Sequence, residues 1–290
     1  MKPRRITPVL LAFVVSATVS ARAGATISVV ATVFPIAAIV GQIGGQFVAV
    51  HTLLPAGANP HTFEPTPEQL RVMASAALIV RVGAGLDDWL ARLLATSDGA
   101  APTIAITDGL ELLGPADSPH GDPHVWLDPV LVRDRIVPKL VLALTNAEPQ
   151  RQADFEGAAT QFAAELTQLD RDIAGALQPL SHRGFVAVHP AWRYFARRYG
   201  LEEVAVIESS PGKEPSAQAI AAIIERGRAR QVRVVLTEPQ MTERTAVVIA
   251  RELGAVVVNV DPLGGPHVPQ RDSYLALMRY NLRVFEQALR

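Results

Sequence analysis

The apolar residues of this chain alternate between short strand-like runs and helix-like segments. Runs rich in Val and Ile predict buried parallel strands over 26–33, 47–54, 78–82, 103–106, 184–188, 203–207, 233–237 and 255–260. Apolar residues three or four positions apart predict helices over 35–43, 69–76, 87–95, 129–144, 191–199, 215–228, 242–253 and 273–289. The alternation predicts an α/β fold with two parallel sheets, each flanked by helices on both faces.

A longer amphipathic segment separates the two halves. From Pro149 to Leu177, apolar residues recur every three or four positions, which predicts one helix about 43 Å long. The alternative is two helices broken at Gly157 or Gly175, but one glycine costs only about 1 kcal/mol relative to alanine. We therefore expect a connecting helix within residues 147–180 that spans an N-terminal lobe, 24–146, and a C-terminal lobe, 181–290.

The first 23 residues have the pattern of a secretory signal peptide. Lys2, Arg4 and Arg5 precede an apolar run over 9–19, and Ala-Arg-Ala at 21–23 has the small-x-small form of a cleavage site. The apolar run is shorter than the roughly 20 residues that a membrane span needs. We therefore favour a signal peptide over a membrane anchor and expect cleavage after residue 23.

Composition narrows the class of protein further. With 290 residues, 49% of them hydrophobic and 19% charged, the chain can bury a large core. A net charge of −1 without a basic run after the first residues indicates no nucleic-acid partner. The absence of cysteine excludes disulfides, thiolate metal sites and a lipidated cysteine. We expect a soluble periplasmic protein without a lipid anchor, whose metal ligands would be nitrogen and oxygen.

Four residues of metal-binding type follow predicted strands. His124 lies in the segment GDPHVWLDP, and His61, His189 and Asp261 each come after the end of another strand. Ligands of open α/β sheets bind at the carboxyl ends of the strands, and two of these four residues come from each half. Each alone would more often be an ordinary turn residue. Together, three imidazoles and a carboxylate predict a tetrahedral zinc site.

Several motifs occur in an order that resembles a known family. They are PHTFEPTPEQL at 60–70, DPHVWLDP at 122–129, HPAWRYFARRYGL at 189–201, GKEPSAQAIAAII at 212–224 and DPLGG at 261–265. They resemble the zinc/manganese solute-binding proteins of bacterial ABC importers, the cluster A-I type, over essentially the whole mature chain. The resemblance implies two α/β lobes joined by a long rigid helix, with the metal in the cleft between them. It implies a non-enzymatic protein that captures zinc in the periplasm and delivers it to a membrane permease.

The resemblance also assigns the ligands and favours one metal. His61, His124, His189 and Asp261 match the family's four ligands in order, and manganese members typically have Glu at the position of His189. Three imidazoles favour Zn²⁺ over Mn²⁺, which prefers oxygen ligands, while copper and nickel are chemical competitors. Many zinc members carry a long acidic, His-rich loop before the second ligand. Here only Asp117, His120 and Asp122 remain near His124, and we interpret His120 as a loop histidine rather than an accessory donor.

Three alternatives remain open from the sequence. An exported zinc hydrolase would use the three histidines, a metal-bound water and Glu64 as base, unless Asp261 fills the fourth position. A manganese-specific binding protein and a surface adhesin would use the same fold. We expect a monomer whose partner is the permease, and a metallochaperone would be a further partner. Other residues are interpreted as structural: Trp89, Trp126 and Trp192 as packing, Gly83-Ala84-Gly85 as a turn, and His51, His182 and His267 as histidines without partners.

Overall fold

The computed structural model describes residues 26–94, 101–114, 120–208 and 214–290. The expected signal peptide, residues 1–23, lies outside this part of the chain, as do Asp117 and the first residues of the motif at 212–224. Among the helices of the described residues, none combines the length and the apolarity that a membrane crossing requires.

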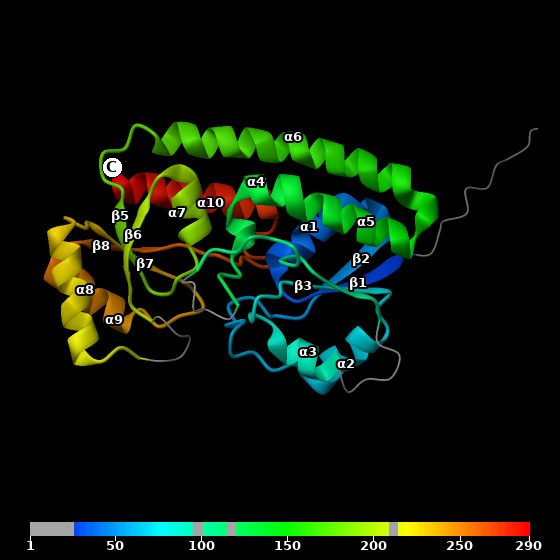
Figure 1. The fold of residues 1–290 in the computed structure, drawn as a ribbon, viewed down its shortest axis with the longest axis horizontal. Coiled ribbons are helices and arrows are strands. Elements are labelled where there is room, and N and C mark those ends of the chain that lie inside the picture. The colour runs from blue at the N-terminus through cyan, green and yellow to red at the C-terminus, as the bar shows by residue number, and fades with distance from the viewer. Residues whose placement is uncertain (1–25, 95–100, 115–119, 209–213) are drawn as a thin grey trace, which may run out of the picture.

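The structure contains two four-stranded parallel sheets with the same strand order (Figure 1). The first has the order β2-β1-β3-β4 and the second β6-β5-β7-β8, and every neighbouring pair is parallel. The α/β fold predicted from the alternation of strands and helices is therefore confirmed. The strands are β1 (Ile27–Ala31), β2 (Val48–Thr52), β3 (Leu78–Arg81), β4 (Thr103–Ala105), β5 (Gly184–Ala187), β6 (Glu202–Val206), β7 (Val234–Thr237) and β8 (Val256–Asn259).

The helices follow the predicted segments with small shifts at their ends. They are α1 (Phe34–Gly44), α2 (Pro67–Ala74), α3 (Asp88–Leu94), α4 (Pro129–Leu131), α5 (Val137–Ala147), α6 (Gln152–Leu177), α7 (Arg193–Tyr199), α8 (Ala217–Ala229), α9 (Arg244–Leu253) and α10 (Tyr274–Leu289). The predicted helix 129–144 is continuous from α4 to α5 through a π-helical segment, Val132–Ile136. Asp128 caps it, because its side chain accepts hydrogen bonds from the backbone N–H groups of Val130 and Leu131.

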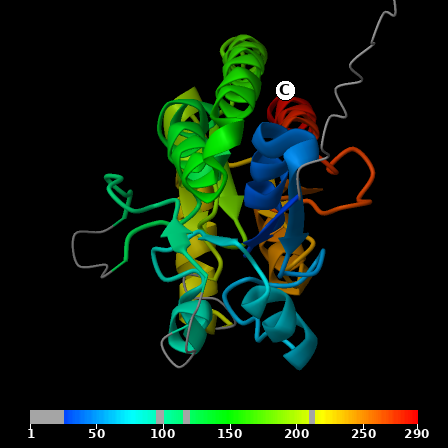
Figure 2. The ribbon, with the colours of Figure 1, turned by 90° about the vertical axis from the view of Figure 1, so that its right-hand side faces the viewer.

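Each sheet is the middle layer of three. One face of the first sheet packs against α2 and α3, and the corresponding face of the second packs against α8 and α9, each through its own apolar cluster. The opposite faces of both sheets share a single core that runs from β1 to α10. In the end-on view, α1, α6 and α10 lie on the side opposite to α2 and α3 (Figure 2). The shared core therefore joins the two lobes into one packed body.

The 26-residue helix α6 spans both lobes. It contacts α1 and α5 of the first lobe and α7 and α10 of the second, and it runs along the length of the molecule (Figure 1). At 1.5 Å per residue its length is about 39 Å. Gly157 and Gly175 lie inside the helix without interrupting it. The prediction of one long helix joining the lobes is confirmed.

Hydrogen bonds tie the lobes together beside the strand ends. The indole Nε1 of Trp126 donates to the carbonyl oxygen of Pro262 (2.7 Å), and the hydroxyl of Tyr274 donates to the carbonyl oxygen of Trp126 (2.7 Å). The hydroxyl of Tyr194 donates to the carbonyl oxygen of Asp122 (3.0 Å). Trp126 thus does more than fill the core, because it also fixes the loop after β8 against the first lobe.

Candidate metal centre

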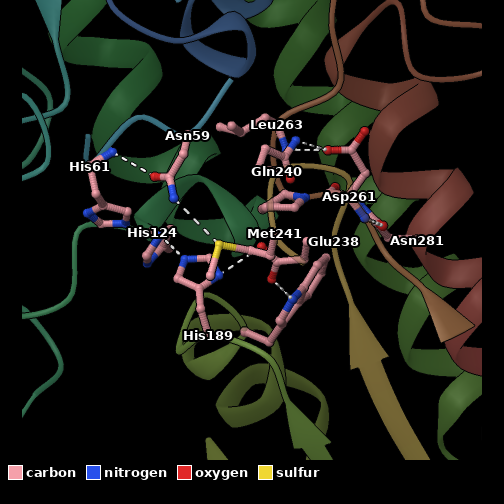
Figure 3. Close-up of polar contacts among 12 residues, drawn as sticks. Asn59, His61, His124, His189, Glu238, Gln240, Met241, Asp261, Leu263 and Asn281 are labelled. Atoms are coloured by element: carbon pink, nitrogen blue, oxygen red, sulfur yellow. Dashed lines mark hydrogen bonds and ion pairs between the residues drawn. The ribbon is translucent and has the colours of Figure 1, made fainter. Parts of the chain in front are cut away.

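Three of the predicted ligands converge between the lobes (Figure 3). His61 lies in the loop after β2, His124 in the segment between β4 and α4, and His189 just after β5. His124 and His189 are buried and His61 is partly buried. One potential ligand atom from each ring lies within 4.8 Å of the other two. Two imidazoles from the first lobe and one from the second therefore face a common point.

The spacing of these rings suits a single metal ion. The Nε2 atoms of His124 and His189 are 3.2 Å apart. Two nitrogens bound to one tetrahedral zinc at 2.0–2.1 Å lie about 3.3 Å from each other. Nε2 of His61 is buried and has no hydrogen-bond partner among the residues that the structure describes, which is costly for a polar atom unless a ligand satisfies it. The donor set of three imidazole nitrogens fits Zn²⁺.

A buried carboxylate lies behind each of the two buried histidines. Oδ1 of Asp122 is 2.8 Å from Nδ1 of His124, and Oε2 of Glu238 is 2.8 Å from Nδ1 of His189. The Glu238 contact is an ion-pair distance without the direction of a good hydrogen bond. A carboxylate beside Nδ1 favours a proton on that nitrogen, which leaves the Nε2 lone pair free for a metal. Glu238 is itself oriented by Trp192, whose Nε1 donates to Oε1 (2.9 Å).

Asp261, the fourth predicted ligand, lies apart from the three histidines. Its Oδ1 accepts hydrogen bonds from the backbone N–H groups of Leu263 (3.0 Å) and Gly264 (2.9 Å) and from Nε2 of Gln240 (3.0 Å). Its Oδ2 pairs with Nη1 of Arg271 at 2.9 Å. Asp261 is absent from the residues that line the pocket of the three imidazoles. The structure thus brings three of the four residues together, and the role of Asp261 as a ligand stays a prediction.

The sequence matches the model of one protein family over most of its length. The family model described as "Zinc-uptake complex component A periplasmic" matches residues 29–288.

The chain belongs to this zinc-uptake family.

Two relatives and one solved structure are similar to this chain over most of its length. A "Putative metal-binding protein" of Thermotoga maritima is 31% identical, with 91% of this chain and 93% of the relative covered. The "Zinc-binding lipoprotein AdcA" of Streptococcus pneumoniae is 27% identical over 95% of this chain, which spans only 58% of that relative's length. A crystal structure of ZnuA superimposes with a TM-score of 0.82 at 31% identity, covering 91% of this chain and 100% of that chain.

In this zinc-uptake family member, the histidines have different affinities for protons. Burial, followed by the proximity of His124 and His189, lowers the pKa of His61 to about 3. Burial acts to lower the pKa of His189, but Glu238, through its charge and its contact with Nδ1, together with the charges of Asp122 and Glu203, outweighs burial and raises that pKa above its ordinary value. The imidazole of His61 is therefore neutral at every physiological pH, whereas His189 holds a proton more readily than an ordinary histidine.

The pocket includes residues that the sequence analysis did not single out. Oδ1 of Asn59 accepts the backbone N–H of His61 (3.0 Å), and Nδ2 of Asn59 donates to the sulfur of Met241 in the other lobe (3.5 Å). Glu238, Gln240 and Met241 all follow β7 at its carboxyl end. The strand-end rule that selected the histidines could have found this segment. The pocket is lined by Asn59, Pro60, His61, His124, His189, Glu238, Gln240, Met241, Pro262 and Leu263.

Other candidate residues lie outside the pocket. Glu64 is exposed and does not line it, and the side chain of His120 is exposed as well. Gly83 and Gly85 have φ angles of +86° and +83° in the turn between β3 and α3, which agrees with a strand-to-helix connection.

Proposed function

We propose that this zinc-uptake family member captures Zn²⁺ outside the cytoplasmic membrane and delivers it to the membrane permease of an ABC importer. The observation that carries the proposal is the convergence of His61, His124 and His189, with 3.2 Å between the Nε2 atoms of the last two. These three nitrogens would hold the ion directly. Asp122 and Glu238 would fix the ring orientations of His124 and His189 through Nδ1.

Zinc is the cargo that this donor set supports best. Three neutral imidazoles suit Zn²⁺, whereas Mn²⁺ prefers a site rich in oxygen. The predicted oxygen ligand, Asp261, would first have to leave Arg271. The relative AdcA carries the name of a zinc-binding protein, which agrees with this assignment.

A zinc hydrolase, the main alternative, has less support. Its expected base, Glu64, is exposed and does not line the pocket. The pocket carboxylate of Glu238 is engaged on one oxygen by Trp192 and lies beside His189 on the other. Neither carboxylate is therefore arranged to activate a metal-bound water. We propose a binding protein without catalytic activity.

The proposal also covers the processing and the location of the mature protein. We propose that residues 1–23 are removed on export and that the mature chain is a periplasmic monomer. We also propose that it carries no lipid anchor, since the sequence has no cysteine that could be lipidated. The relative AdcA is named a lipoprotein, so anchoring differs between the two in this proposal. The mature chain would comprise an N-terminal lobe, 24–146, a connecting helix within 147–180 and a C-terminal lobe, 181–290. Intact-mass measurement of exported protein tests both the cleavage site and the absence of lipid.

The metal site is tested by removing single imidazoles. We expect His124→Ala and His189→Ala to lower zinc affinity more than about 100-fold, beyond the 10–100-fold typical of an outer partner. His51→Ala is the matched control, because His51 is exposed on β2 and should leave the affinity unchanged. The measurement is competition against a zinc chelator, with native mass spectrometry of protein purified without added metal. Unaltered zinc binding in both site variants would refute the proposed function.

A further inference from the structure

The main chain of Asp261 is fixed, so only its side chain could move towards the histidines. The amide of Asn281, a fully buried residue of α10, accepts the backbone N–H of Asp261 (2.8 Å) and donates to its carbonyl oxygen (2.7 Å). The carboxylate must therefore break its present contacts to reach the pocket. The strength of those contacts decides whether Asp261 is available as a ligand.

Arg271 is held in place to face this carboxylate. Its backbone N–H donates to the carbonyl oxygen of Val268 (3.0 Å), and its carbonyl oxygen accepts from the N–H of Gly265 (3.3 Å). The loop closes this tightly because Gly264 has a φ of +65° and a Cβ there would lie 2.5 Å from the Arg271 carbonyl oxygen. The guanidinium carbon also lies 4.7 Å from the centre of the Tyr280 ring, within range of a cation–π contact.

The resulting ion pair is shielded from solvent. The side chain of Asp261 is 4% exposed and that of Arg271 is 21% exposed. Screening by water and salt is weak at such exposure, and a hydrogen bond between two charged groups is among the strongest in proteins. A metal ion competes with this arginine for Oδ2 and with three hydrogen-bond donors for Oδ1.

The two candidate cations differ in how much they need that oxygen. Zn²⁺ forms stable sites with three protein ligands and a water molecule as the fourth. Mn²⁺ favours carboxylate and water oxygen over imidazole, so it loses more when the nearby carboxylate is withheld. The free energy needed to separate Asp261 from Arg271 therefore weakens the binding of Mn²⁺ more than that of Zn²⁺.

We propose that Arg271 is a specificity-determining residue, which withholds the Asp261 carboxylate from the cation and thereby favours zinc over manganese. The proposal rests on the proposed function, because it concerns the same three-histidine site. Arg271 acts through Asp261, because its guanidinium contacts this carboxylate and the ring of Tyr280. The fourth position on zinc is then a water molecule rather than a carboxylate.

The test compares zinc and manganese affinities of matched variants. Arg271→Met keeps an unbranched side chain beside Tyr280 but removes the charge. We expect it to raise manganese affinity about tenfold or more, the size expected from losing one charge-assisted hydrogen bond. Arg283→Met is the control, since Arg283 is exposed on α10 and bonds Gln270 instead of Asp261. It should leave both affinities unchanged.

Asp261→Asn tests whether the carboxylate is a ligand of the metal or only the partner of Arg271. With Arg271 present, we expect zinc affinity to fall less than about tenfold, well below the loss of a true ligand. In the double variant Arg271→Met/Asp261→Asn, the gain in manganese affinity should disappear. A Co²⁺-loaded sample reports the change independently, because its visible spectrum changes when a carboxylate replaces water.

Two outcomes would overturn the inference. One is a loss of zinc affinity in Asp261→Asn as large as that in His189→Ala. The other is an unchanged ratio of zinc to manganese affinity in Arg271→Met. If Arg271→Met fails to fold, Arg271→Gln is measured against the same criterion. Failure of the proposed function is distinguishable, because it appears in the His124→Ala and His189→Ala variants with Arg271 intact.

Discussion

Replacing Glu238 by Gln tests whether the carboxylate behind His189 supports metal binding. Both of its oxygens are in use, one at 2.9 Å from the indole Nε1 of Trp192 and the other at 2.8 Å from Nδ1 of His189. Gln has nearly the same shape but only one accepting oxygen. Either the indole loses its acceptor or His189 loses the oxygen beside Nδ1, and in both cases the negative charge beside His189 disappears.

The expected size of the effect follows from this geometry. Outer carboxylates of this kind are typically worth about 10–100-fold in metal affinity, or about 1.4–2.8 kcal/mol. The side chain of Glu238 is only 1% exposed, so water cannot replace the lost acceptor. We expect a value within that range, and a smaller thermal stabilisation of the variant by a given zinc concentration.

The assay is zinc competition against a chromophoric chelator at constant pH, with Glu238→Gln, the wild type and a control compared. Glu243→Gln is a suitable control, because Glu243 is exposed just before α9 and does not line the pocket. The reasoning is refuted if Glu238→Gln binds zinc as tightly as the wild type while Glu243→Gln also does so. Wild-type affinity would mean that His189 needs no carboxylate to present its Nε2.

The remaining predictions concern pH, the hydrogen bond between Tyr274 and Trp126, and the orientation of the lobes. Because Glu238 raises the pKa of His189 against the effect of burial, zinc affinity should fall as pH drops through the histidine range, by about tenfold per pH unit below that pKa. In Glu238→Gln the fall should begin at a lower pH. Zinc titrations from pH 5 to 8 of the wild type and the variant check this. His61, with a pKa of about 3, should add nothing to that dependence, so a zinc affinity that stays constant from pH 8 to pH 5 would contradict the role of His189 as the titrating ligand. Tyr274→Phe leaves the carbonyl oxygen of Trp126 without its 2.7 Å donor and should cost about 1–3 kcal/mol in the free energy of unfolding at unchanged zinc affinity, as measured by denaturant titration. Metal-free and zinc-bound crystals should show the same lobe orientation with movement confined to the ligand loops, because α6 and the shared core join the lobes, and a large rotation would disprove this.

The periodicity of apolar residues along the chain was sufficient to predict the α/β architecture. A strand such as Ile27–Ala31, in which apolar residues point to both faces, is typical of a parallel sheet covered on both sides, and a regular apolar stripe such as that of α6 needs partners along its whole length. The positions of His61, His124 and His189 after strand ends were likewise readable, because the carboxyl ends of parallel strands lie on one edge of a sheet. These features depend on local sequence, and the structure contains them where the pattern predicts them.

The partners of the site residues were decided by tertiary structure. Asp122 lies two residues from His124, but Glu238 is far from His189 in sequence and meets it only because β7 lies beside β5 in the sheet. Asp261 shows the limit most clearly. Its sequence position qualifies it as a ligand, but its carboxylate contacts Arg271, the amide of Gln240 and two backbone N–H groups. Sequence thus determined which donors stand at the strand ends. Three-dimensional packing determined which of them face each other. A residue such as Arg271, which competes for the Asp261 carboxylate, comes close to it only in the folded chain, and no pattern of neighbouring residues in the sequence predicts that contact.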